Sequence, residues 1–205
     1  MRILLIDTTT SFVTVSIFNN NEIVYNFREQ IKDDMSSKLI PIIEEGFKQV
    51  DFSLKDIDKI LVVNGPGSFT GIRVGVTVAK TIAWALKKDI IPISSLELIA
   101  TTHTSKKYIV PMIDARRGNV FGAIYDKDLN PVISDQLINL HDLTDGLDDD
   151  YEFISYDNIA IENVVKPDID IIKIINKHIN DKKVNPHKLN PRYLKMTEAE
   201  ENLKG

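Results

Sequence analysis

The segment "IDTTTSFVTVSIFNN", residues 6–20, is the part of the chain that most strongly predicts the fold, because its pattern occurs a second time. The segment "IDARRGNVFGAIYDK", residues 113–127, aligns with it without a gap, so that Asp7 falls on Asp114 and Val13 on Val120. In both segments an apolar strand ends at an aspartate, and a short turn leads to a second apolar strand. Such an internal repeat indicates a duplication. We therefore expect two lobes, each of which opens with a β-hairpin.

The remaining apolar pattern alternates between strands and helices, which indicates an α/β protein. Strands are predicted at residues 2–7, 13–18, 22–28, 59–64, 108–114 and 119–126. Helices are predicted at about residues 37–50, 71–88 and 168–179, with a short helix capped by Ser94 or Ser95. Pro41 would kink the first of these helices if it began as early as Asp33.

The composition is that of an ordinary globular protein. Of the 205 residues, 43% are hydrophobic and 27% are charged, which suits one large domain or two closely packed lobes. The chain has no cysteine, which excludes disulfides, thiolate metal sites and cysteine nucleophiles. The N-terminus lacks the apolar length of a signal peptide, and no apolar run is as long as a membrane span. We therefore expect a cytoplasmic protein that does not contact a membrane.

The balance of charge is acidic. A net charge of −5 makes it unfavourable for the isolated chain to hold nucleic acid, because phosphate contacts dominate that affinity. The chain could still belong to a complex in which a partner binds nucleic acid. Residues 145–152, "DGLDDDYE", are expected to form a solvated loop, since their spacing is not that of a calcium site.

A glycine-rich loop, "VVNGPGSFTGIRVG" at residues 62–75, joins a predicted strand to a predicted helix. It lacks the lysine of a P-loop, and its glycines do not have the dinucleotide-binding spacing. A helix N-terminus nevertheless attracts anions. Two interpretations stay open: a phosphate site, or a tight turn that Gly65 and Gly67 permit and in which Thr70 caps the helix. The candidate nucleotide or phosphate residues are Asp7, Thr8, Gly65, Gly67, Ser68 and Asp114.

Evidence for catalysis in the sequence is weak. Asp7 and Asp114 could act together across a cleft, as two aspartates do in actin-like ATPases and sugar kinases, but Arg116 and Arg117 replace the small residues of a second phosphate loop. Ser68 lacks the first glycine of a nucleophile elbow, which leaves a hydrolase as a weaker alternative. The four histidines do not have the spacing of a metal site. We therefore assign no catalytic residue and no metal ligand.

The helix after the glycine loop carries a stripe of small residues, Gly71, Gly75, Ala79 and Ala83. Glycine within a helix costs about 1 kcal/mol relative to alanine, so a close neighbour is expected there. That neighbour is either the sheet of the same chain or a helix of a partner. On the opposite arc, Trp84 lies among Arg73, Lys80 and Lys87, and it is either an interface anchor or a residue covered by the second lobe. The preceding helix has a wide apolar stripe, of which one side can meet a partner.

The segments "GPGSFTGIRVG", "IDTTT" and "IDARRGNVF", together with "LNPRYLK" near the C-terminus, resemble the TsaB (YeaZ) family. The resemblance runs nearly the whole length and is densest over residues 1–126. It implies an actin-like fold of two ribonuclease-H-like lobes. The lobes would be residues 1–104 and a smaller C-terminal lobe, residues 105–205, with an extended tail.

The same resemblance implies the function of an accessory subunit rather than an enzyme. Members of the family pair with TsaD, which transfers threonylcarbamoyl to the adenosine next to the anticodon of tRNA in bacteria, and the ATPase TsaE joins them. We expect a non-catalytic scaffold or activator that contacts tRNA only through the complex. We also expect it to form a homodimer when alone. No cofactor of its own is implied, although ATP or ADP could bind at the partner junction. The alternative function is an actin-like ATP-dependent phosphotransferase or ATPase that uses Asp7 and Asp114.

The resemblance places the partner interface on the two helices whose stripes are described above. The interface residues that it implies are Met35, Leu39, Ile42, Ile43, Arg73, Gly75, Val76 and Ala79. On this view Gly75→Leu should block pairing while leaving the fold intact. The phosphotransferase alternative predicts magnesium-dependent ATP hydrolysis that is lost in Asp7→Ala.

Overall fold

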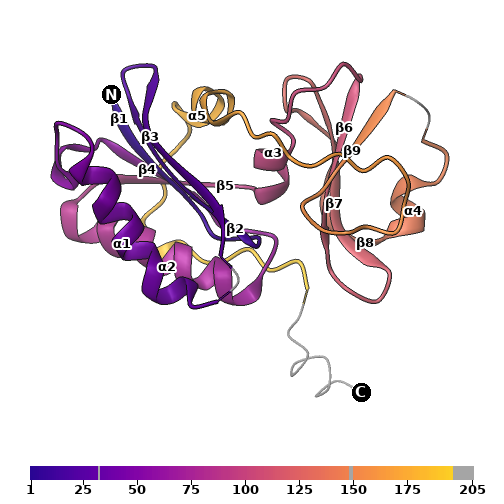
Figure 1. Cartoon of the computed structure of the whole chain (residues 1–205), viewed down its shortest axis with the longest axis horizontal. Coiled ribbons are helices and arrows are strands. Elements are labelled where there is room, and N and C mark those ends of the chain that lie inside the picture. Colours follow the sequence, from indigo (N-terminus) through magenta and orange to yellow (C-terminus); the bar gives the residue numbers. More distant parts are fainter. Residues whose placement is uncertain (32, 148–149, 196–205) are drawn as a thin grey trace.

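The structure is a computed structural model that describes residues 1–31, 33–147 and 150–195. It has two lobes side by side, each built around its own β-sheet (Figure 1). Two carboxylates of the acidic segment, Asp148 and Asp149, and the last part of the tail lie outside the described residues.

The first lobe contains a five-stranded sheet with the order β3-β2-β1-β4-β5. β1, β2 and β3 are antiparallel neighbours, and β4 and β5 continue the sheet in parallel with β1. Four of the strands were predicted, with ends that differ by up to two residues, and β5 was not. The strands are β1 (Arg2–Asp7), β2 (Phe12–Asn19), β3 (Glu22–Gln30), β4 (Lys59–Val63) and β5 (Asp89–Ile93).

The second lobe repeats this topology in a four-stranded sheet with the order β8-β7-β6-β9. β6, β7 and β8 are antiparallel, and β9 is parallel to β6. The prediction that each lobe opens with a hairpin is therefore confirmed, whereas β8 and β9 were not predicted. The strands are β6 (Tyr108–Asp114), β7 (Asn119–Asp126), β8 (Pro131–Asn139) and β9 (Tyr151–Ile154).

The strand pairing of the two hairpins differs by one residue. The ungapped alignment of residues 6–20 with residues 113–127 therefore shifts one of the two strands by one position. Asp7 lies opposite Thr14 in the first hairpin, but Asp114 lies opposite Val120 in the second. Because side chains alternate along a strand, a shift of one residue exchanges the two faces of the sheet. Asp7 lies on the same face of its sheet as Leu5, which packs in the core between the lobes. Asp114 instead lies on the same face of its sheet as Met112, which belongs to the small core on the other side of the second sheet.

The helices begin and end where local signals place them. α2 begins after Ser68, whose Oγ accepts a hydrogen bond of 3.2 Å from the Gly71 N–H. The prediction of Thr70 as the cap is therefore wrong. Ser94 caps α3, as one of the two predicted alternatives. Pro41 lies inside α1. The helices are α1 (Met35–Lys48), α2 (Phe69–Leu86), α3 (Ser95–Ile99), α4 (Leu140–Thr144) and α5 (Ile171–His178), with 3-10 turns at Leu54–Asp56 and Pro186–Lys188.

The first sheet lies between two layers of helix. α1 and α2 cover one face, and α5 covers the other, while α3 lies between the two lobes (Figure 1). A core cluster that includes Leu4, Ile6 and Val15 packs under α1 and α2. A second cluster joins Ile3 and Leu5 to α3, α5 and the facing side of the second sheet. The lobes therefore share one continuous apolar core.

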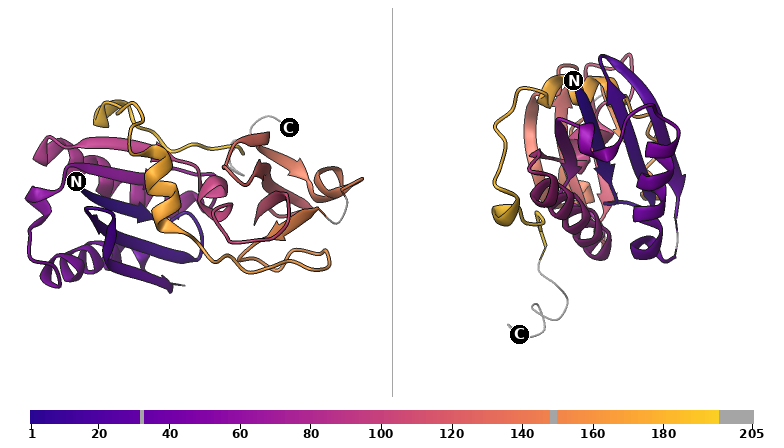
Figure 2. Two further views of the ribbon diagram at one scale, coloured as in Figure 1. Left: turned by 90° about the horizontal axis from the view of Figure 1, so that it is seen from above. Right: turned by 90° about the vertical axis from the view of Figure 1, so that its left-hand side faces the viewer.

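The end of the chain returns from the second lobe to the first. Ile171, Ile174 and Ile175 of α5 are buried in the shared core. Val184 then pairs with Ile90 at the edge of the first sheet, and the chain runs down the outside of the first lobe (Figure 2). The division at residue 104 separates the two sheets in the sequence, but as a division into domains it stays a prediction.

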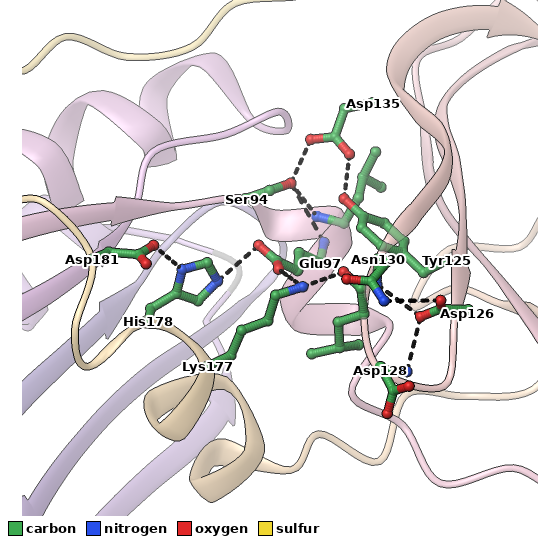
Figure 3. Close-up of polar contacts among 12 residues, drawn as sticks. Ser94, Glu97, Tyr125, Asp126, Asp128, Asn130, Asp135, Lys177, His178 and Asp181 are labelled. Atoms are coloured by element: carbon green, nitrogen blue, oxygen red, sulfur yellow. Dashed lines mark hydrogen bonds and ion pairs between the residues drawn. The ribbon is translucent and has the colours of Figure 1, made fainter.

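A buried polar junction fastens the two lobes and the tail together, and Figure 3 shows the part of it formed by Ser94, Tyr125 and Asp135. Asp135 of β8, whose side chain is 3% exposed, accepts three hydrogen bonds of 2.6 Å. The donors are the Ser94 hydroxyl of the first lobe, the Tyr125 hydroxyl of the second lobe and the Arg192 guanidinium of the tail. Burial and the neighbouring Asp135 carboxylate raise the pKa of Tyr125, so this phenol stays protonated and donates.

Next to this junction, Glu97 of α3 holds two cations of α5. Its carboxylate contacts Lys177 Nζ at 2.9 Å and His178 Nε2 at 3.0 Å. Burial alone would raise the pKa of Glu97, but the hydrogen bonds from His178 and Lys177 outweigh it and lower the pKa. Lys177 Nζ also donates to the Leu129 carbonyl in the β7–β8 turn. α5 therefore connects the first lobe to the second.

Candidate functional site

A cleft of about 780 Å³ lies between the lobes, where the turns of the two hairpins face each other. Residues 9–11 of the first hairpin and residues 114–116 of the second form two of its walls. The glycine-rich loop and the first turn of α2 form the third. The fourth wall is the tail from Arg192 to Lys195, which the sequence did not point to.

The glycine-rich loop is packed against the turn of the first hairpin. The Ser68 N–H donates to the Thr9 carbonyl at 2.7 Å. A Cβ atom on Gly67 would overlap that same carbonyl oxygen, and one on Gly71 would overlap the Thr8 carbonyl oxygen. The glycines are therefore required because the backbone of the loop and helix touches the backbone of the turn.

The small-residue stripe of α2 thus has its neighbour within the chain. A Cβ atom on Gly75 would overlap Thr8 Oγ1, and this hydroxyl donates to the Gly71 carbonyl at 2.6 Å. Gly75 is buried. The expectation that Gly75→Leu would leave the fold intact is wrong, because a leucine has no space beside Thr8.

Asp7 lies behind the cleft rather than in its lining. Its side chain is buried, and its Oδ1 accepts hydrogen bonds from the Thr9 N–H at 2.8 Å and the Thr9 hydroxyl at 2.7 Å. Burial raises the pKa of Asp7 to about 6, against the effect of the Thr9 hydrogen bonds and of the nearby Arg28. With a pKa of about 6, this buried and hydrogen-bonded carboxyl changes its charge state just below neutral pH, and it is a structural group rather than an exposed phosphate or metal ligand.

We expect Asp7→Asn to change the pH dependence of stability. The folded carboxyl keeps its proton up to about pH 6, whereas the unfolded one releases it near 3.8, so wild-type stability falls between these values. The asparagine keeps the acceptor for Thr9 and cannot ionise. Its free energy of unfolding should therefore rise relative to wild type by about 3 kcal/mol across this range and then stay level. Urea unfolding at a series of pH values measures this. A difference that does not vary with pH would contradict it.

Asp114 is exposed at the edge of the cleft. Its Oδ1 accepts from the Arg116 N–H at 2.8 Å, and its own N–H donates to Asp157 Oδ2 at 2.8 Å. The structure therefore brings Asp114 to the cleft together with Gly67 and Ser68, whereas Asp7, Thr8 and Gly65 do not line it. Three cations line it as well, Arg116, Arg192 and Lys195. The nucleotide or phosphate site stays a prediction.

The expected partner residues on α1 and α2 fall into two groups. Leu39, Ile43, Gly75, Val76 and Ala79 are buried against the first sheet and its hairpin, so a partner cannot touch them in this structure. The physical reason is that an apolar stripe on a helix packs first on the sheet of its own chain.

The other three expected partner residues reach the surface. Met35 and Ile42 are half-buried. Arg73 is exposed but engaged, because its Nε donates to the Tyr193 hydroxyl at 2.7 Å and its guanidinium lies over the Phe69 ring. The location of the partner interface itself stays a prediction.

Over residues 1–31, 33–147 and 150–195, histidine and carboxylate side chains do not gather in threes as a metal site would require. Within the same ranges, none of the helices has the length and apolarity needed to cross a membrane.

Comparison with known proteins identifies similar sequences and structures. Residues 27–179 match the family model described as TsaD, tRNA N6-adenosine threonylcarbamoyltransferase. The tRNA threonylcarbamoyladenosine biosynthesis protein TsaB of Bacillus subtilis is 34% identical over 146 residues, which cover 69% of this chain and 64% of that protein. The protein of the same name from Escherichia coli is 32% identical over 135 residues, which cover 64% of this chain and 58% of that protein. The chain thus spans less than two thirds of each of these relatives.

The fold itself is found in solved structures. YeaZ from Pseudomonas aeruginosa superimposes with a TM-score of 0.79 at 20% identity, covering 94% of this chain and 99% of that one. A second Pseudomonas aeruginosa structure, of an uncharacterized protein with similarity to peptidase YeaZ, gives a TM-score of 0.81 at 19% identity, covering 95% and 99%. The predicted actin-like α/β fold of two ribonuclease-H-like lobes is confirmed.

Proposed function

This chain belongs to the family that the TsaD model describes and, within it, to the TsaB (YeaZ) proteins, and from that premise we propose that it serves tRNA threonylcarbamoyladenosine biosynthesis. Its role in this proposal is that of a non-catalytic subunit. It pairs with TsaD, the threonylcarbamoyltransferase, and contacts tRNA within that complex. TsaE is the third member of the complex.

The observation that carries the non-catalytic role is the separation of the two aspartates. A phosphotransferase of the actin-like type would need both carboxylates to face one bound nucleotide. Here Asp7 is buried and hydrogen-bonded to Thr9, whereas Asp114 is exposed at the edge of the cleft. The one-residue difference in register turns the two side chains to different faces of their sheets. This arrangement favours a scaffold over the phosphotransferase alternative.

The surface that fits a protein partner is the outer side of α1 and α2, which pack side by side. Ile40 of α1 is 43% exposed on this side. Val74 and Val78 of α2 are half-buried. TsaD, or a second copy of this chain when TsaD is absent, would cover this face. ATP or ADP bound at the junction with TsaD would lie near Arg116, Arg192 and Lys195, the cations that line the inter-lobe cleft.

Reconstitution tests the proposal. The protein is combined with TsaD, TsaE and the adenylate synthase of its own organism, together with tRNA, threonine, bicarbonate and ATP, and modified adenosine is measured. We expect modification to require this chain, and Ile40→Glu to weaken pairing with TsaD by about tenfold or more, because the added carboxylate would be buried at the interface.

The matched control is Val132→Glu, which places the same charge on a 55% exposed residue of β8 in the second lobe. It should pair and support modification as wild type does. Equal modification with and without the chain would overturn the proposed function. Unchanged pairing in Ile40→Glu would overturn the assignment of the surface only.

A further inference from the structure

A groove of about 540 Å³ lies at the C-terminal end of α2, away from the inter-lobe cleft. One wall is the last turn of α2 with the residues that follow it, and the other is residues 183–187 of the returning chain. Trp84 stands at this groove with 60% of its surface exposed, although tryptophan is highly buried on average. The exposed indole therefore needs an explanation.

The groove is basic in a chain that is acidic overall. It is lined by Lys87, Lys88 and Lys183, and among the described lining residues Asp89 is the one carboxylate. Asp89 is already paired, since its Oδ1 contacts Lys183 Nζ at 2.9 Å. Lysines near a helix C-terminus are favoured by the helix dipole, which accounts for Lys87 and Lys88 in part. Lys183 comes from a distant part of the chain and is held at the groove by this ion pair with Asp89.

The indole contacts the His187 ring and remains mostly exposed to solvent. The His187 ring meets Trp84 edge-on, with 6.1 Å between ring centroids and 70° between ring planes. Lys80, one turn earlier in α2, donates its Nζ to the Leu189 carbonyl and so fixes the returning chain along the helix. The position of the ring is therefore set by the fold before any ligand binds.

An exposed aromatic ring flanked by lysines is the arrangement by which proteins hold single-stranded nucleic acid. A base stacks on the ring, and the cations lie along the phosphates. We propose that this groove is an RNA contact, in which an unpaired base of the RNA stacks on Trp84 and the adjoining phosphates lie near Lys87, Lys88 and Lys183. This inference rests on the proposed function, since a protein that serves tRNA modification meets RNA as the substrate of its complex.

The acidity of the rest of the chain limits the strength of this contact. A net charge of −5 repels RNA from most of the surface, so the groove supplies a local and salt-sensitive contact rather than tight binding by the isolated chain. An acidic protein segment could also meet three lysines, but it would leave the indole without a stacking partner. Stacking on the indole therefore distinguishes RNA from an acidic protein segment.

The chain has one tryptophan, so its intrinsic fluorescence reports on this groove directly. The full chain is titrated with unmodified tRNA and with a single-stranded oligoribonucleotide at several salt concentrations. We expect quenching of Trp84 emission, with a slope of log affinity against log salt of about −2 for three phosphate contacts to a single strand. The double variant Lys87→Glu, Lys88→Glu should weaken binding by at least about tenfold near 0.1 M salt.

The matched control is Lys127→Glu, an exposed lysine in the β7–β8 turn of the second lobe, which should bind as wild type does. Absence of quenching by either RNA, or equal loss of affinity in the control, would overturn the proposal. Quenching by poly-glutamate as strong as that by RNA would also overturn it, in favour of an acidic protein ligand.

The proposed function can fail independently of this groove. If reconstituted modification does not require the chain, but RNA still quenches Trp84 in a salt-dependent way, the groove is an RNA contact that serves another process. If modification requires the chain and the groove variants behave as wild type in both assays, the scaffold role stands and the groove proposal is wrong.

Discussion

Gly71→Ala is expected to lower the free energy of unfolding by about 3 kcal/mol, at the upper end of what overpacking usually costs. The added methyl group would overlap the Thr8 carbonyl oxygen, which is part of the backbone of the first hairpin turn. That turn is fixed by the hydrogen bonds of Asp7 to Thr9 and by the Ser68 N–H, so neither side can move cheaply. The gain of about 1 kcal/mol that alanine brings to a helix is too small to compensate.

Gly75→Ala offers a way to separate the clash from other effects. Its methyl group would meet the Thr8 side chain rather than backbone, with Thr8 Cβ still 3.5 Å away. In a Thr8→Ala background the hydroxyl is gone, so the second alanine should be neutral or stabilising. Thr8→Ala should not rescue Gly71→Ala, because the carbonyl oxygen remains. The three single variants and the two double variants therefore form two double-mutant cycles with opposite expected results.

Denaturant unfolding measures all of these variants, with Thr77→Ala on the exposed side of α2 as the control. That substitution touches no neighbour and should change the free energy of unfolding by less than about 0.5 kcal/mol. Equal stability of Gly71→Ala and wild type would show that the hairpin turn does not hold the position described here.

The second large effect is expected for Asp135→Ala, which should cost about 3 kcal/mol. Removing this carboxylate leaves the hydroxyls of Ser94 and Tyr125 without their acceptor inside the junction, and frees the Arg192 guanidinium. Unpairing a buried ion costs about 3–5 kcal/mol, and the lower end applies because Arg192 is 42% exposed and can regain water.

The same variant should also loosen the tail. Arg192 anchors the fourth wall of the cleft, so limited proteolysis should cleave near it faster in Asp135→Ala than in wild type. Asp128→Ala removes an exposed carboxylate from the adjoining β7–β8 turn and is expected to change neither measurement. Similar losses in both variants would mean that the lobes are not fastened through Asp135.

The local pattern of the sequence predicted the hairpins because alternation of apolar residues is itself a local property. β5 escaped prediction because its run "DIIPI" follows α2 directly and is too short to show a period. β8 was not predicted because two irregularities in its pairing with β7, next to Ile124, break the alternation of inward and outward side chains. Elements whose pattern is complete within one segment can be found from the sequence, and elements that depend on a neighbour cannot.

The residues of the candidate site also fall into those with a local sequence signal and those without one. The sequence placed Asp7 and Asp114 at a cleft, and of these Asp114 lines it. It gave no signal for Arg192 and Lys195, because the return of the tail is a tertiary event without a local pattern. The periodicity of α2 correctly indicated a close neighbour for Gly75. It could not tell whether that neighbour was Thr8 of the same chain or a residue of a partner.

The return of α5 and residues 184–189 to the first lobe has a consequence for synthesis on the ribosome. β1, β2 and β4 emerge early, yet the side of their sheet that carries Ile3 and Leu5 is covered in part by α5, which follows the whole second lobe in the sequence. In the nascent first lobe this apolar face therefore stays uncovered while the whole second lobe is translated. During that interval the uncovered face is a surface that chaperones can bind, and the lobe completes its packing only after α5 has been made.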